Sequence, residues 1–192
     1  MSTIVTANSR TRRRIPTDRE LMALPKDGYK RELLHGEIVM TPAGSEHGHE
    51  IMQFAAAFAS FVYQHKLGQV FDGQTGFRMK SRDVLSPDIS FLSRARLREA
   101  GGTPKGFFEG APDLAIEFLS PRESKKRMQQ KLAQYFENGA RFAWVMDSKP
   151  RIVAVHHGVE PLKLLKETDL LSGESIVPGF EIAVSTVFAG IE

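Results

Sequence analysis

Two carboxylates that border or interrupt apolar runs are the first candidates for chemistry in this chain. Glu117 lies among the apolar residues of 114–119, and Asp88 directly precedes the strand-like run 89–92. A carboxylate inside a buried strand is costly unless a cation or hydrogen-bond donors receive it. If the two strands are neighbours, about 4.8 Å apart, both carboxylates can bind one Mg²⁺ ion together with water. The spacing therefore predicts a hard-cation site at Asp88 and Glu117.

A second Pro-Asp pair offers Asp113 as an alternative partner for Glu117. Asp113 precedes Glu117 on the same expected strand, and the rise per residue separates the two by roughly 13 Å. Two carboxylates this far apart cannot share one ion, so Asp88 is favoured. Taken singly, either Asp88 or Glu117 could also be an exposed acid at a strand end.

The helix expected after the Glu117 strand adds an amine. Lys131 lies one turn after Met128 and one turn before Tyr135, at the border of the apolar stripe. Its stem can run along the core while the amine reaches the sheet edge, and the alternative is an ordinary solvent-facing lysine. Two carboxylates, one Mg²⁺ ion and one amine suit phosphodiester hydrolysis. The ion polarises the phosphoryl oxygen and activates water, while the lysine orients that water or stabilises the charge on phosphorus.

The elements that must position these residues follow from the apolar periodicity. Residues 29–40 alternate around Gly36 and predict an N-terminal hairpin, and residues 46–66 repeat at helical spacing, with Gly68 expected to end that helix. Glycine-interrupted strand is expected at 69–80, and further strands at 84–92, 114–119, 141–147 and 151–157. A second helix is expected from Ser120 to Asn138. This order predicts an α/β fold with a central mixed β-sheet flanked by helices.

Composition narrows the class of protein. With 192 residues and 41% hydrophobic content, the chain is expected to form a single domain at 18–192 after a disordered basic arm at 1–17. The absence of Cys excludes disulfides, thiolate zinc sites and cysteine nucleophiles. No apolar run approaches the ~20 residues of a membrane span, and no secretion signal follows the first residues. We therefore expect a cytoplasmic protein that does not bind membranes.

The cations are clustered although the net charge is only +3. A basic group follows the Glu117 strand and comprises Arg122, Lys125, Lys126 and Arg127. It indicates either a solvated helix face or contacts with nucleic-acid phosphates. If the second interpretation holds, these four residues bind DNA.

Several motifs resemble the Uma-two (Uma2) family of putative restriction endonucleases, a branch of the PD-(D/E)xK nuclease superfamily. The likeness runs through RELLHGEIVM, PAGSEHG, LSPDISFL, PDLAIEFLSP, KLAQYFENGARFAWVMD and VPGFEI. It implies a restriction-endonuclease-like core and Mg²⁺-dependent nuclease chemistry at Asp88 and Glu117. It also singles out Glu32, His47 and Lys131 at the matching motif positions.

One departure from the superfamily pattern concerns its lysine. That pattern has the lysine two residues after the second acid, where this chain has Leu119. The resemblance therefore assigns the amine to Lys131 on the following helix, with Lys125 and Lys126 as alternatives. The metal ligands we expect are Asp88, Glu117 and the backbone carbonyl of Phe118.

The residues alone leave alternatives for the two remaining members of this set. Glu32 could be a third ligand or hold water, or it could pair with Arg31 on an exposed hairpin. His47 could contact phosphate or relay protons, or it could be a capping or exposed residue at the start of its helix.

Three functions are compatible with these expectations. The first is a Mg²⁺-dependent DNA endonuclease in which Mn²⁺ can substitute, and two-fold symmetry would suit double-strand cutting by a homodimer. The second is a non-catalytic nucleic-acid or protein-binding module on the nuclease fold. The third is a hydrolase of a small phosphate ester. The intact acids favour catalysis, whereas the missing lysine at position 119 favours the binding module.

Overall fold

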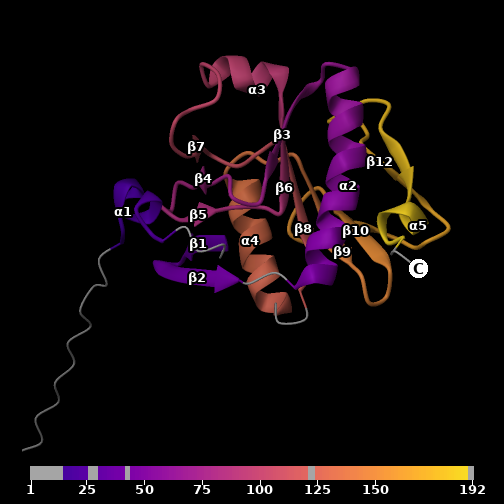
Figure 1. Cartoon of the computed structure of the whole chain (residues 1–192), viewed down its shortest axis with the longest axis horizontal. Coiled ribbons are helices and arrows are strands. Elements are labelled where there is room, and N and C mark those ends of the chain that lie inside the picture. The colour runs from indigo at the N-terminus through magenta and orange to yellow at the C-terminus, as the bar shows by residue number, and fades with distance from the viewer. Residues whose placement is uncertain (1–14, 26–29, 42–43, 121–123, 190–192) are drawn as a thin grey trace, which may run out of the picture.

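The computed structural model describes residues 15–25, 30–41, 44–120 and 124–189 (Figure 1). The helices in these ranges are α1 Asp18–Met22, α2 Ser45–Gln64, α3 Arg94–Glu99, α4 Lys125–Glu137 and α5 Val184–Val187. The strands are β1 Lys30–Leu34, β2 Glu37–Thr41, β3 Gly68–Asp72, β4 Phe77–Arg78, β5 Val84–Leu85, β6 Ile89–Ser93, β7 Phe108–Glu109, β8 Leu114–Phe118, β9 Phe142–Asp147, β10 Ile152–His156, β11 Pro161–Leu165, β12 Leu170–Ser172 and β13 Glu181–Ala183. Residues 1–14 of the expected basic arm lie outside the description, so the division of the chain at residue 17 stays a prediction.

A six-stranded mixed sheet forms the centre of the fold, in the order β11-β10-β9-β8-β6-β3. β8 and β9 run parallel, whereas the other neighbours in this sheet are antiparallel. The parallel pair follows from α4, which connects β8 to β9 as a crossover helix. The mixed α/β architecture expected from the order of the elements is confirmed.

The two faces of this sheet are covered by different helices. α2 buries Phe54, Phe58 and Val62, spaced four residues apart, in one core. α4 buries Met128 and Leu132 in a second core. Strand residues alternate between these two cores, as the pleat requires. The side of the sheet toward which a strand residue points can therefore be read from its position.

The predicted N-terminal hairpin is confirmed and belongs to a second sheet. β1 and β2 pair antiparallel around His35 and Gly36, which both adopt positive φ angles, 52° and 74°. They form one edge of a five-stranded sheet in the order β2-β1-β5-β4-β7. The expected strand at 69–80 is divided, because β3 lies in the central sheet and β4 in the second. Figure 1 shows β1 beside α4, which places the hairpin next to the helix that carries Lys131.

The start of α4 differs from the sequence prediction. The helix begins at Lys125 rather than near Ser120, because the Ser124 side chain caps it by accepting a hydrogen bond from the Arg127 backbone N–H. Its last residue is Glu137, one residue before the predicted end at Asn138, which is the C-cap and is followed by Gly139 at a φ of 101°.

The longest described helix, α2, has 20 residues and carries both Glu46 and Glu50. Within the described ranges, no helix combines the length and the apolar character needed to cross a membrane.

The sequence predicted that Gly68 ends α2. In the structure α2 ends at Gln64, and Gly68 is the first residue of β3. Lys66 takes the left-handed conformation after the helix, at a φ of 54°. Gly68 is required for another reason, because a Cβ there would overlap the backbone carbonyl of Leu92 on β6.

We expect Gly68→Ala to lower the free energy of unfolding by about 1–3 kcal/mol or more, measured by urea denaturation. Gly48→Ala is the matched control, because a Cβ at Gly48 in α2 meets nothing within 4 Å and should stabilise the helix by about 0.5–1 kcal/mol. Equal effects of the two changes would contradict this role of Gly68.

Candidate metal and nuclease site

Glu117 is a buried carboxylate on the α4 face of the central sheet. In β8 the side chains of Leu114, Ile116 and Phe118 belong to the α2-side core, whereas Ala115 belongs to the α4-side core. Glu117 follows the parity of Ala115 and therefore points toward α4. Only 1% of the residue is exposed, so its charge depends on protein partners.

Asp88 lies directly opposite Glu117. β6 and β8 pair antiparallel with Ile89 opposite Ile116, so the next position of the register brings Asp88 opposite Glu117. Residues opposite one another share a face of the sheet. Asp88 Oδ2 accepts a hydrogen bond from the backbone N–H of Phe118 at 2.8 Å. The expected adjacency of the two strands, on which a shared ion depends, is therefore present.

Asp113 lies at the other end of β8 and has a different role. Its carboxylate accepts a hydrogen bond from the Ser93 backbone N–H at 2.8 Å and lies 3.7 Å from the Arg96 guanidinium. It thereby connects the end of β6 and the start of α3 to β8. The choice of Asp88 over Asp113 as the acid facing Glu117 agrees with this geometry.

α4 delivers two side chains to Glu117. Lys131 Nζ lies 2.6 Å from Glu117 Oε1, and the Tyr135 hydroxyl donates a hydrogen bond to the same oxygen at 2.5 Å. Positions four residues apart lie on one helix face, which explains how both reach one carboxylate oxygen. Lys131 is 2% exposed, so the alternative of a solvent-facing lysine is wrong.

Glu32 enters the same cluster from β1. Its Oε1 lies 3.2 Å from Lys131 Nζ and accepts a hydrogen bond from the Ser86 backbone N–H at 2.9 Å. Arg127 lies 3.8 Å from the other oxygen, Oε2. Glu32 is 4% exposed and is therefore not part of a surface pair with Arg31. Lys131 thus bridges two buried carboxylates that come from different sheets.

Neighbouring ammonium groups decide the charge of Asp88 and Glu32. Burial alone would raise the pKa of both carboxyl groups. The charges of Lys30 and Lys131, with hydrogen bonds that include backbone N–H groups, outweigh burial and hold both pKa values below their usual range. Burial would lower the pKa of Lys30, but the attraction of Asp88 and the other carboxylates raises it. Asp88, Glu32 and Lys30 are therefore charged at neutral pH.

Glu117 behaves differently because burial dominates its titration. Burial raises the pKa of Glu117 to about 7 despite Lys131 and Lys30, and the charges of Asp88 and Glu32 add to the rise. Burial and the neighbouring Glu117 raise the pKa of Tyr135 well above its ordinary value, so its hydroxyl remains a donor. Glu117 is therefore the carboxyl group of this cluster that exchanges a proton near neutral pH.

This titration predicts a pH-dependent stability difference between the wild type and Glu117→Gln. The folded pKa of about 7 exceeds the unfolded value of 4.5, so the folded state binds more protons in this window and the contribution of Glu117 to stability falls as pH rises through it. From about pH 5 to pH 8 the variant should gain roughly 2–3 kcal/mol relative to the wild type. Urea denaturation in a chelator at several pH values measures this. A difference that stays constant over the range would contradict the raised pKa.

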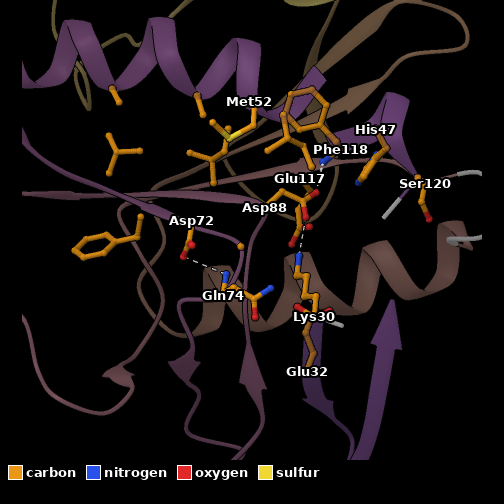
Figure 2. A pocket seen from close by; sticks show the side chains of 18 of the residues that line it. Lys30, Glu32, His47, Met52, Asp72, Gln74, Asp88, Glu117, Phe118 and Ser120 are labelled. Carbon is orange, nitrogen blue, oxygen red and sulfur yellow. Dashed lines mark hydrogen bonds and ion pairs between the residues drawn. The ribbon is translucent and has the colours of Figure 1, made fainter. Parts of the chain in front are cut away.

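A pocket of about 1050 Å³ opens onto this cluster (Figure 2). Five charged residues of the cluster line it, namely Lys30, Glu32, Asp88, Glu117 and Lys131. Apolar residues line the rest, among them Met52, Ala55, Ala56 and Ala59 from α2 and Val70 and Phe71 from β3. The buried acids are therefore open to a ligand from one side.

The other predicted site residues divide between the pocket and the surface. His47, in the first turn of α2, lines the pocket and contacts the Phe118 ring edge to face, with centroids 6.3 Å apart. Gly44 rather than a side chain caps this helix. Lys125 and Lys126 are exposed in the first turn of α4. Arg127 turns toward Glu32 instead, and Arg122 lies outside the described residues.

Sequence reasoning missed Lys30 and placed Tyr135 only in the apolar stripe. Lys30 Nζ lies 2.7 Å from Asp88 Oδ1 and completes the partners of that carboxylate. The signal for Lys30 was its position two residues before Glu32, which puts both side chains on one face of a strand. The signal for Tyr135 was its position four residues after Lys131.

The cluster lacks a third metal-binding side chain. Among the described residues, no three His, Cys, Asp or Glu side chains are grouped so that they could hold a metal ion. Glu32 is therefore not placed as a third carboxylate ligand beside Asp88 and Glu117. A cation at these two acids would take its remaining ligands from backbone oxygens or water.

Comparisons with known proteins agree with this architecture. The crystal structure of a putative nuclease belonging to DUF820, from Anabaena variabilis, matches this chain with a TM-score of 0.77 and 21% sequence identity. The match covers 90% of this chain and 97% of that one, and it confirms the restriction-endonuclease-like fold.

None of the curated proteins that were compared matches the chain. Residues 18–185, most of the chain, match the family described as Uma2, putative restriction endonuclease. This family and this fold together support a nuclease, and hence an enzyme. The chain thus belongs to the Uma2 family of putative restriction endonucleases.

Proposed function

We propose that this protein is a Mg²⁺-dependent DNA endonuclease that hydrolyses phosphodiester bonds. The observation that carries the proposal is the position of Asp88 and Glu117, opposite one another on one sheet face, with Lys131 in contact with Glu117. Both acids line the same pocket as the lysine. Two carboxylates and an amine that share a pocket are the groups that metal-assisted phosphodiester hydrolysis requires.

The donor chemistry of the cluster fits Mg²⁺. Carboxylate and carbonyl oxygens are the ligands that this ion prefers, and Asp88, Glu117 and the Phe118 carbonyl would hold it. Three carboxylates face two ammonium groups and the Arg127 guanidinium, so the protein's own cations balance the acids when Glu117 is ionised. Burial is the main cause of the raised pKa of Glu117, and a divalent cation beside this carboxylate would favour its ionised form. When bound, Mg²⁺ or its substitute Mn²⁺ would act as a Lewis acid on the phosphodiester and activate water.

The surrounding residues hold the acids in position for this chemistry. Lys131 and Tyr135 both contact Oε1 of Glu117, so α4 fixes the position of this carboxylate. Glu32 holds Lys131 from the other side, so that the ammonium lies between two carboxylates and faces the pocket. There it can orient water or stabilise the developing charge on phosphorus. His47, on the pocket wall, is placed to contact phosphate or relay a proton.

DNA is the proposed substrate because cations lie at the start of α4. Lys125 and Lys126 are exposed there, next to the segment that contains Arg122. Arg127 lines the pocket and can contact a phosphate from its position near Glu32. These contacts would give DNA affinity that falls as the salt concentration rises. A homodimer would bring two such sites to the two strands of a duplex.

Supercoiled plasmid is the direct test of this function. Incubation of the full chain with plasmid and Mg²⁺ or Mn²⁺ should yield nicked and linear DNA, and a chelator should stop the reaction. Cleavage that continues in the chelator would show that the metal is not required. Absence of cleavage with either ion, on plasmid and on short duplexes, would argue against the endonuclease.

One observation favours a second candidate, a non-catalytic nucleic-acid or protein-binding module. Both oxygens of Asp88 already have protein partners, Lys30 and the Phe118 backbone N–H. A protein that had lost metal binding could retain such an internally neutralised acid. This module would bind DNA in a salt-sensitive manner yet bind no divalent cation, which calorimetric titration with Mn²⁺ distinguishes from the endonuclease.

A further inference from the structure

Lys30 places its amine on one carboxylate oxygen of Asp88, and both residues line the pocket. Its Nζ lies 2.7 Å from Asp88 Oδ1, and the two side chains are 15% and 10% exposed. Figure 2 shows the Lys30 side chain rising from β1 with its amine directed at Asp88, beside Glu117. The amine thus lies where the proposed function requires a cation.

The two lysines of the cluster are held differently. Lys131 is 2% exposed and contacts both Glu117 and Glu32, so it is fixed between two elements. Among the described residues, Lys30 forms an ion pair with Asp88 and lies on the pocket wall. The flexible four-carbon stem of a lysine lets such an amine move when its partner changes.

Asp88 itself can change partner without moving. Its Oδ2 is anchored by the Phe118 backbone N–H at 2.8 Å, whereas Oδ1 contacts the Lys30 amine. One oxygen therefore positions the carboxylate and the other is neutralised by a side chain that can leave. An ammonium and a divalent cation at the same oxygen would repel one another strongly, so only one of them can occupy it.

We propose that Lys30 is an exchangeable counter-cation of Asp88, which neutralises Oδ1 when no divalent cation is bound and gives up this oxygen when one binds. The inference rests on the proposed metal site. It makes Lys30 a positioning residue that weakens cation binding in the free protein. Once released, the amine remains on the pocket wall, where it can pair with the phosphodiester of a substrate.

Direct Mn²⁺ titration of the full chain, followed by the electron paramagnetic resonance signal of free Mn²⁺, tests the exchange. Lys30→Met keeps the length of the stem and removes the charge, and it should bind Mn²⁺ roughly tenfold more tightly, given the strength of a charge-assisted hydrogen bond. Lys163→Met removes an exposed lysine of β11 and should leave the affinity unchanged. Asp88→Asn should weaken binding at least tenfold.

The outcomes separate this inference from the proposed function. Tighter binding by Lys30→Met supports the exchange, including the case in which only this variant binds measurably. Unchanged or weaker binding by Lys30→Met, with binding still lost in Asp88→Asn, overturns the exchange and leaves the metal site intact. No binding by the wild type and Lys30→Met alike overturns both.

A second measurement uses the wild-type chain and does not depend on the folding of a variant. Amine-reactive labelling of Lys30, followed by peptide mass spectrometry, should be slow in a chelator and several-fold faster in saturating Mg²⁺. In Asp88→Asn the labelling should be fast under both conditions. Labelling of Lys30 that ignores Mg²⁺, in wild-type protein that binds Mn²⁺, would overturn the exchange.

Discussion

Lys131→Met is expected to lower the free energy of unfolding by about 3–5 kcal/mol, the range found when one partner of a buried ion pair is removed. The Lys131 ammonium lies 2.6 Å from Glu117 and 3.2 Å from Glu32. Methionine can fill the space of the stem, but it leaves two buried carboxylates without their shared cation. Because small domains are stable by only about 5–15 kcal/mol, this is a large share of the total. Urea denaturation at neutral pH measures the loss.

Two further variants isolate the ion pair from the packing of α4. Lys126→Met changes an exposed lysine of the same helix and should stay within about 0.5 kcal/mol of the wild type. Combining Lys131→Met with Glu117→Gln should recover part of the loss, because the amide can still accept the Tyr135 hydrogen bond without a charge. If Lys131→Met were no more costly than Lys126→Met, the buried lysine would not stabilise the fold through these acids.

The parts of the site that follow from local sequence were predictable. The apolar neighbours of Glu117 require a buried strand, and the alternation along β8 then fixes the face on which Glu117 lies. Asp88 could be predicted because its strand pairs with β8 through an antiparallel register that keeps the two acids opposite. The adjacency of the two strands was assumed, but once it is given, the parity of each side chain follows from the pleat alone.

The parts that depend on pairing between distant segments were not predictable. Lys30 reaches Asp88 across 58 positions of the chain, and no local pattern of β1 indicates which strand it will meet. The division of residues 69–80 between two sheets has the same origin, since β3 and β4 are assigned by their partners rather than by their own residues. The position of Lys131 on a helix likewise did not determine whether its side chain is buried or exposed. Lys131 is buried because acids from β1 and β8 converge on it, a fact about three elements at once.

The acids also show why burial of charge indicates function more than stability here. Glu32, Asp88 and Glu117 are all nearly inaccessible, and placing hydrophobic residues in such positions is often as stable or more so. Asp113 gives the contrasting case, because its carboxylate satisfies the Ser93 backbone N–H at a strand end. Asp113 of one Pro-Asp pair thus holds a strand end in place, whereas Asp88 of the other pair contributes to a charged pocket. The two can be separated by experiment.

Asp113→Asn is the matched control for the site acid Asp88. Both aspartates follow a proline, border a central strand and are buried, and each accepts a hydrogen bond from a backbone N–H. The amide that replaces Asp113 can still accept from Ser93 but loses the attraction to Arg96. It should therefore cost stability, by about 1–3 kcal/mol, and leave the Mg²⁺-dependent cleavage rate of the folded fraction close to that of the wild type.

Asp88→Asn should reduce the Mg²⁺-dependent cleavage of plasmid DNA by at least about 100-fold, since even second-shell changes at metal sites cost 10–100-fold. The asparagine side chain can keep the hydrogen bond from the Phe118 backbone N–H, so the ends of β6 and β8 stay joined and the protein should fold. It removes the negative charge that the proposed site needs and leaves the Lys30 ammonium facing a neutral amide. Cleavage rates at saturating Mg²⁺, corrected for the folded fraction, compare the wild type, Asp88→Asn and Asp113→Asn. If folded Asp88→Asn cut DNA at the rate of Asp113→Asn, the chemistry would lie elsewhere in the molecule. The described strand β6 offers no other acid opposite Glu117 that could replace Asp88.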